Sequence, residues 1–214
     1  MKLNTAMLKI KVCGLTDPGN VQEIAGTSPD YMGFIFYPGS LRFIGGKPPH
    51  SLFRSVPSHI RKTGVFVNED TTVIIDSVKL YGLDLVQLHG DETPEYCNNL
   101  KNEGLIIIKS FGINNGSDFK IPEPYMDVCD YFLFDTRTES YGGSGQKFEW
   151  VRINEYHLDK PFFLGGGIGP GDATLIKQLN HPQLFAVDIN SRFEIMPGIK
   201  EPKKVRDFIK EIKA

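Results

Sequence analysis

Short apolar runs alternate with helix-like segments along the whole chain, and this alternation constrains the fold more than any other feature. The expected strands cover residues 8–12, 31–36, 63–67, 83–88, 105–109, 131–134, 162–164 and 184–189. Several of them, such as YMGFIF and LFAVDI, are almost wholly apolar. Such runs are typical of parallel strands that are covered by helices outside and packed within.

Four segments between these runs carry clear helix signals, such as a capping residue followed by proline, a terminal glycine or a single apolar face. They cover residues 17–25, 71–81, 93–103 and 203–213. The fifth and sixth helical regions are weaker, because Pro122 and Pro124 interrupt one and the other is short. Eight strand–helix units in 214 residues predict a single (β/α)8 TIM barrel with eight parallel strands, spanning residues 1–214. The pattern alone also fits an open doubly wound sheet.

Composition and charge argue against several classes of protein. The net charge is -2 and no basic run is present, so we expect no nucleic-acid partner. The three cysteines have no CxxC spacing, which argues against a disulfide framework and a zinc site. We find no signal-peptide pattern, dinucleotide fingerprint or apolar run of membrane length. The sequence therefore predicts a cytoplasmic protein with no cofactor, no bound metal and no membrane partner.

Polar residues and glycines follow the expected strands at the end where parallel α/β proteins bind ligands. These residues are Cys13-Gly14, His89-Gly90-Asp91, Asp135-Thr136, Gly165-Gly166-Gly167, and Asp188 with Asn190-Ser191. The glycine triplet precedes a helix, and exposed backbone N–H groups there suit an anion. A tight turn with no ligand explains the same glycines. A surrounding barrel favours a phosphate site.

The side chains at these strand ends each allow two interpretations. Cys13 fits a small buried hydrophobe or a thiolate base. Asp135 fits a local cap or a catalytic acid, and the glycine-rich loop at 141–145 beside it fits a closing lid. Arg42 fits a surface charge or a clamp for a carboxylate or phosphate. His89 fits a structural hydrogen-bonding residue or a substrate contact.

Seven motifs, in order from residue 9 to the C-terminus, resemble those of the phosphoribosylanthranilate isomerases. They are KVCGLT at 11–16, GFIF with SLR at 33–42, VQLHG at 86–90, FDT at 134–136, GGSG with Phe148 and Trp150 at 142–150, GGGI at 165–168, and VD with Glu194 and PGIK at 187–200.

The resemblance implies an Amadori rearrangement in tryptophan biosynthesis. N-(5-phosphoribosyl)anthranilate becomes 1-(2-carboxyphenylamino)-1-deoxyribulose 5-phosphate. By this resemblance Asp135 is the general acid, which needs a raised pKa, and Cys13 is the general base, which needs a lowered one.

Further roles follow from the same resemblance. Arg42, His89 and Asp188 contact the substrate, with Arg42 orienting its anthranilate part. The phosphate is held by Gly166, Gly167, Asn190 and Ser191. The implied partner is this one small molecule, and family members occur as monomers and homodimers.

Two departures from the family pattern concern loops. Arg192 stands where many members have glycine, so the turn there is expected to differ. Leu41 replaces a proline before Arg42. Cys13 at the end of the first strand distinguishes this sequence from other phosphosugar barrels. A histidine-pathway isomerase would carry an aspartate at that position. The alternative of another class is a non-catalytic phosphosugar-binding barrel, which has no reason to keep Cys13 and Asp135 together.

Overall fold

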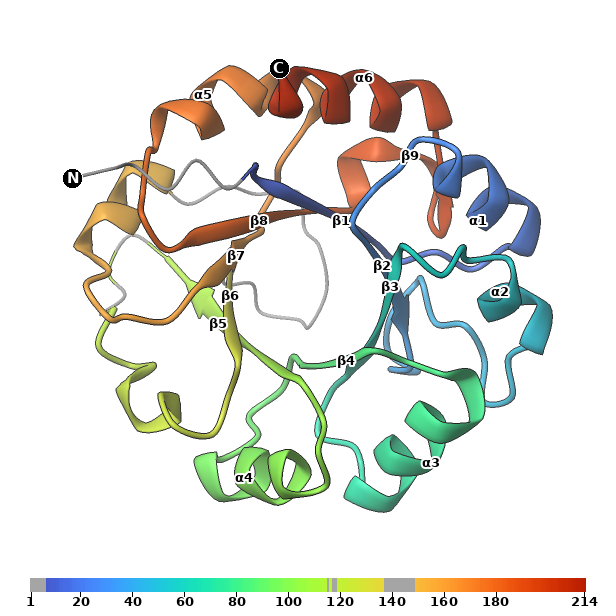
Figure 1. Cartoon of the computed structure of the whole chain (residues 1–214), viewed down its shortest axis with the longest axis horizontal. Helices are drawn as coiled ribbons and strands as arrows, with labels where there is room; N and C mark the ends of the chain where they lie inside the picture. The colour runs from blue at the N-terminus through green and yellow to red at the C-terminus, as the bar shows by residue number, and fades with distance from the viewer. Residues whose placement is uncertain (1–6, 115, 117–118, 137–148) are drawn as a thin grey trace.

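Eight parallel strands close into a barrel in the computed structural model, which describes residues 7–114, 116, 119–136 and 149–214 (Figure 1). Each strand pairs with the next, and β8 pairs with β1. The strands are β1 (Lys9–Cys13), β2 (Tyr31–Ile35), β3 (Arg61–Phe66), β4 (Leu85–Leu88), β5 (Ile107–Ile113), β6 (Tyr131–Thr136), β7 (Phe162–Leu164) and β8 (Leu184–Ile189). The predicted (β/α)8 barrel is confirmed, and an open sheet is excluded.

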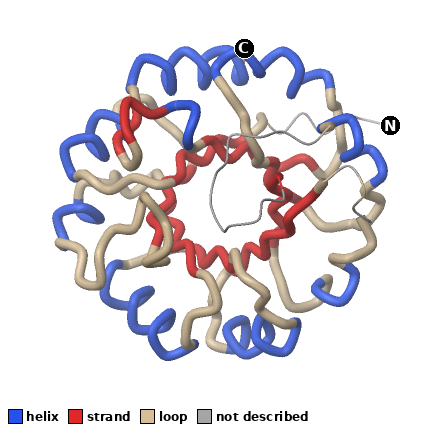
Figure 2. Tube along the Cα trace, turned by 180° about the vertical axis from the view of Figure 1, so that it is seen from behind, coloured by secondary structure: helices blue, strands red, loops and turns tan. Residues whose placement is uncertain are grey.

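Helices surround the barrel on its outside, as Figure 2 shows from behind. They are α1 (Pro18–Ala25), α2 (His50–Arg54), α3 (Thr71–Tyr81), α4 (Pro94–Asn102), α5 (Ala173–Gln178) and α6 (Pro202–Lys213). Within the described residues, the weak fifth and sixth regions form only the 3-10 turns Glu123–Tyr125 and Trp150–Glu155. Among those residues no helix is long and apolar enough to cross a bilayer.

Local capping explains why several helix boundaries were predictable. The Asp17 carboxylate accepts a hydrogen bond from the Asn20 backbone N–H at 2.7 Å, and Pro18 follows it at the start of α1. Helix α3 ends at Gly82, whose φ of 62° lies in the left-handed region that glycine adopts without strain. These boundaries depend on neighbouring residues only.

Strand β6 is longer than the sequence predicted. The expected strand ended at Phe134, but the ladder with β5 continues through Asp135 and Thr136, which pair with Gly112 and Ile113. Backbone pairing does not depend on side-chain polarity, so a strand can continue beyond the end of its apolar run. Asp135 therefore lies within a strand rather than in the loop after it. The expected lid at 141–145 lies outside the described residues.

An apolar layer fills the lower part of the barrel interior. It consists of Tyr31, Leu85, Ile108, Leu133, Phe163 and Ala186, with Tyr131 and Phe185 packed against it. Because alternate residues of a strand point to the same side, the residues two positions further on also point inward. On β4, β6 and β8 these are Gln87, Asp135 and Asp188, so a polar layer lies directly above the apolar one.

A buried ion pair fixes the loop after β4. The Lys109 ammonium donates to the Glu92 carboxylate at 2.9 Å and to the Gly90 carbonyl at 2.7 Å. Glu92 also accepts hydrogen bonds from the backbone N–H groups of Asn68 and Gly90. The Lys109 and Glu92 side chains are almost fully buried, at 3% and 1% exposure. This network holds the loop that carries His89.

Replacing Lys109 by methionine should therefore destabilise the fold. Lys109→Met leaves Glu92 buried without its cation, and breaking such a pair costs about 3–5 kcal/mol. Urea unfolding followed by circular dichroism measures the loss. Lys203→Met, which removes a lysine from an exposed ion pair on α6, is the control and should leave the free energy of unfolding unchanged. Equal stability of the two variants would contradict this role.

Candidate active site

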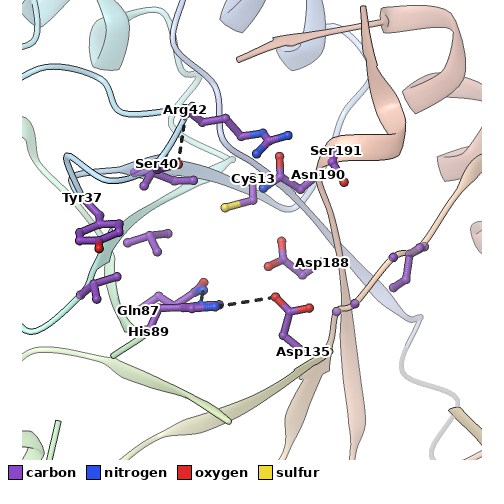
Figure 3. Close-up of a pocket in the computed structure, with 17 residues that line it drawn as sticks. Cys13, Tyr37, Ser40, Arg42, Gln87, His89, Asp135, Asp188, Asn190 and Ser191 are labelled. Atoms are coloured by element: carbon purple, nitrogen blue, oxygen red, sulfur yellow. Dashed lines mark hydrogen bonds and ion pairs between the residues drawn. The ribbon is translucent and has the colours of Figure 1, made fainter. Parts of the chain in front are cut away.

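One cleft at the carboxyl ends of the strands contains every residue that the sequence singled out for substrate chemistry (Figure 3). Its volume, open mouth included, is about 750 Å³. The predicted residues that line it are Cys13, Arg42, His89, Asp135, Gly166, Gly167, Asp188, Asn190 and Ser191.

Cys13 ends β1 and is nearly buried, at 4% exposure. It lies opposite Gly33 on β2, and a Cβ atom on Gly33 would stand 2.7 Å from the Cys13 sulfur. Burial raises the pKa of the Cys13 thiol, while the positive charges of Lys11 and Lys200 act against that rise. The sequence predicted a lowered pKa. That expectation is wrong for the free protein, because the thiol loses contact with water and the nearby cations do not compensate fully.

Asp135 has the raised pKa that a general acid needs. Burial is the main cause and the negative charge of Asp188 adds to it, so the pKa of Asp135 rises to about 6. A hydrogen bond from the Thr136 backbone N–H, at 2.7 Å, opposes the rise by stabilising the carboxylate. Asp135 therefore holds a proton at a higher pH than an ordinary aspartate does.

His89 connects Asp135 to Gln87. Its Nε2 lies 3.7 Å from the Asp135 carboxylate, and its Nδ1 lies 2.9 Å from the Gln87 amide nitrogen. Burial, helped by the charges of Lys109 and Lys11, lowers the pKa of His89 to about 4, so the ring is neutral at pH 7. With the amide donating to Nδ1, the ring proton is on Nε2, which points toward Asp135 (Figure 3).

Arg42 is a buried residue and not the surface charge that the sequence also allowed. Its Nε and Nη2 atoms donate to the two oxygens of Glu194 on β9 (Glu194–Met196), each at 2.7 Å. Lys200, on β10 (Ile199–Lys200), donates from its ammonium to Glu194 at 2.5 Å and to the Asn190 side-chain oxygen at 2.6 Å. The β9–β10 hairpin thus fixes Arg42 and Asn190 at the same rim of the cleft.

The glycines after β7 adopt left-handed conformations that other residues rarely adopt. Gly166 and Gly167 have φ values of 88° and 64°. A Cβ atom on Gly166 would collide with the hydroxyl of Thr136 and approach its backbone nitrogen to 2.7 Å. Asn190 and Ser191 line the same cleft.

Arg192, where glycine was expected, causes no strain. Ser191–Phe193 form a 3-10 turn, so Arg192 has the right-handed backbone that any residue can adopt. Its side-chain stem passes over Gly169, and a Cβ there would stand 3.2 Å from the Arg192 Cδ.

Several residues of the site were not singled out from the sequence as chemical groups. Tyr37, Ser40 and Gln87 line the cleft. Behind the lining, Lys11 forms an ion pair with Asp188, and Lys200 forms one with Glu194. A polar residue inside an apolar strand was the available signal for Lys11 and Gln87. Among the described residues, no group of three or more His, Cys, Asp or Glu side chains is arranged to hold a metal ion.

Comparison with known proteins agrees with this geometry. The family model of N-(5'-phosphoribosyl)anthranilate isomerase matches residues 10–211. The N-(5'-phosphoribosyl)anthranilate isomerase of Phocaeicola vulgatus is 43% identical over 204 residues, which cover 95% of this chain and 97% of that protein.

Solved structures of the same enzyme are also similar. A structure of monomers of the dimeric Thermotoga maritima enzyme has a TM-score of 0.81 and 30% identity, covering 97% of this chain and 99% of that one. A structure of the enzyme in complex with reduced 1-(o-carboxyphenylamino)-1-deoxyribulose 5-phosphate has a TM-score of 0.82, 29% identity and the same coverage. The chain described here therefore belongs to the N-(5'-phosphoribosyl)anthranilate isomerase family.

Proposed function

We propose that the chain catalyses the Amadori rearrangement of N-(5-phosphoribosyl)anthranilate with Asp135 as general acid and Cys13 as general base. Membership of the family makes it an isomerase of tryptophan biosynthesis. The observation that carries the residue assignment is the cleft in which Cys13 and Asp135 lie on either side of Asp188 (Figure 3). A sugar between the two groups would meet an acid on one side and a base on the other.

Proton transfers drive each step of the proposed reaction. Asp135 gives its proton to the furanose ring oxygen, the C1–O bond breaks, and the anthranilate nitrogen supplies the electron pair that forms the Schiff base. Cys13 then removes the proton from C2, and the electrons of that C–H bond form the enolamine. The enolamine takes up a proton at C1 and loses the proton of its C2 hydroxyl group, which gives the ketone. Substrate and product are isomers, so we propose a reaction without redox or group-transfer cofactor.

The remaining residues of the cleft suit the two anionic ends of this substrate. The ion pair with Glu194 uses the Nε and Nη2 atoms of Arg42. We propose that the remaining nitrogen, Nη1, donates a hydrogen bond to the anthranilate carboxylate. We assign the phosphate to the backbone around Gly166, Gly167, Asn190 and Ser191. The Asp188 oxygen Oδ1 is buried without a hydrogen-bond partner among the described residues, which suits a polar contact with the amino sugar. His89 would contact the substrate beside Asp135.

We further infer that the protein works in the cytoplasm, as one domain over residues 1–214 and as a monomer or homodimer. Cys13, Cys97 and Cys129 are all free and buried, which suits a reducing compartment. The dimeric Thermotoga maritima relative supports a homodimer as one of the two states.

Removing either proton-transfer group should abolish most of the activity. We expect Cys13→Ala and Asp135→Asn to lower kcat about 10²–10⁴-fold with KM little changed, because neither group holds the phosphate. The loss of substrate fluorescence from the anthranilate ring gives the rate. Cys13→Ser should be similarly impaired, since a hydroxyl is a weak base at neutral pH. The control is Asp76→Asn, on the exposed face of α3. Full activity of natively folded Cys13→Ser would contradict the assignment of the base.

The pH dependence of kcat/KM should show that Asp135 is the stronger acid of the two groups. The productive form needs Asp135 protonated and Cys13 ionised. Below pH 6 Asp135 stays protonated and the thiolate fraction increases tenfold per unit, so log kcat/KM should rise with unit slope up to about 6. Above that pH the loss of protonated Asp135 cancels the gain of thiolate, so the profile should stay flat until Cys13 ionises.

A fall beginning near pH 6 would instead mean that the thiolate forms below the pKa of Asp135. It would contradict the raised pKa of the Cys13 thiol in the free protein.

Substitution of Gly166 should weaken substrate binding at the phosphate end. Gly166→Ala adds a methyl group against Thr136 at a φ of 88°, so the loop must move. We expect KM and the inhibition constant of inorganic phosphate to rise at least about tenfold, with kcat changed less. In Gly171→Ala the new Cβ meets no atom within 4 Å, so both constants should stay as they are. Unchanged phosphate inhibition in Gly166→Ala would show that the phosphate binds elsewhere.

A further inference from the structure

Lys11 lies under the floor of the active-site cleft and does not line it. It is two residues before Cys13 on β1, so both side chains point into the barrel. The β1–β8 ladder pairs Lys11 with Asp188, and the Lys11 ammonium donates to the Asp188 carboxylate at 2.9 Å. The Lys11 side chain is 0% exposed, whereas Asp188 reaches the cleft at 11%.

A cation at this depth acts on every titrating group of the site. Lys11 interacts electrostatically with both Asp188 and Cys13. Its charge also reaches Asp135 and His89 across the barrel. Isolated ammonium groups are rarely buried, and a purely structural role could be filled by two apolar side chains of similar volume. The position of this charge, two residues before the proposed base and paired with Asp188, points to a part in the reaction.

Cys13 is also faced by charges from other elements. Asp188 on β8 is the anion, while Lys200 on β10 and Arg42 from the loop after β2 are the other cations. Lys200 and Arg42 are both bound to Glu194, which offsets part of their charge. Lys11 is the cation that shares the inward face of β1 with Cys13, and its charge opposes the rise of the thiol pKa.

We propose that Lys11 is a positioning residue for this reaction: from below the floor, paired with Asp188, its ammonium supplies the positive charge that lets Cys13 act as a thiolate. The inference rests on the proposed role of Cys13 as the base. Lys11 touches no substrate in this proposal and acts through Cys13 and Asp188. It also stabilises the ionised form of Asp135, so one cation influences both ends of the proton transfer.

Opposite substitutions in the ion pair should have opposite effects on the thiol. Lys11→Met keeps the length of the side chain and removes the cation, so the Cys13 thiolate loses its partner. Asp188→Asn keeps the shape of its side chain and removes the anion that opposes the thiolate. A purely structural ion pair would loosen the site in the same way in both variants, so the sign of each effect separates the two roles.

The experiment measures the rate at which iodoacetamide alkylates Cys13 across a pH series, read by mass spectrometry of the peptide that contains Cys13. This readout needs neither substrate nor activity, and it uses the full chain. The pH midpoint should rise by about one unit or more in Lys11→Met and fall in Asp188→Asn. Lys11→Arg, which keeps the charge, should stay close to the parent midpoint. Circular dichroism verifies that each variant is folded, and Asp188→Asn with Lys11→Arg still decides the question if Lys11→Met does not fold.

Steady-state profiles then separate this inference from the proposed function. Loss of Lys11 should move both limbs of the kcat/KM profile to higher pH, because the pKa values of Cys13 and Asp135 both rise. Midpoints that do not move, or that move in the same direction in Lys11→Met and Asp188→Asn, overturn the role of Lys11, whatever the activity. If the midpoints move as expected but Cys13→Ala retains full activity, the role of Lys11 toward the thiol is upheld and the assignment of Cys13 as base fails.

Discussion

Closure of the barrel between β8 and β1 is the constraint on which the rest of the structure depends. It sets Lys11 beside Asp188, although the two residues are 177 positions apart in the chain. The inward positions then alternate in layers, with apolar side chains such as Leu133 and Ala186 below and carboxylates two residues above them. The catalytic layer thus rests on the packed apolar layer, which limits water beneath it and strengthens every charge interaction there.

Buried charges in such an interior are costly unless each has a partner, and the barrel provides one for most of them. Lys109 is paired with Glu92, and Arg42 and Lys200 share Glu194. These pairs connect loops to strands: one holds the loop of His89, and the other joins the β9–β10 hairpin to the loop after β2. Networks of this kind fix geometry more than they add stability, because their attraction mainly repays the cost of removing the charges from water.

The sequence was informative where a feature depends on neighbouring residues or on strand order. The caps at Asp17 and Gly82 are local, and the strand order of a barrel brings Cys13, Asp135 and Asp188 to one mouth whatever the details of packing. Ion pairs between distant residues could not be predicted from the sequence. Arg42 and Glu194, for example, are 152 residues apart, and no local pattern links them. The predicted direction of the Cys13 pKa shift was also wrong, since this shift depends on how deeply the finished fold buries the sulfur.

The two proton-transfer groups place opposite electrostatic demands on one site. In the free protein Asp135, with a pKa of about 6, is protonated in only about one molecule in ten at pH 7. On the proposed mechanism the substrate brings a carboxylate and a phosphate into the cleft. This added negative charge favours the protonated acid and disfavours the thiolate. A cation that offset the negative charge of the substrate throughout the cleft would lower the pKa of Asp135, so that Asp135 would lose its proton. Lys11 lies instead beneath the cleft lining, paired with Asp188 and two residues before Cys13 on β1, so its charge acts most strongly where an anion must form.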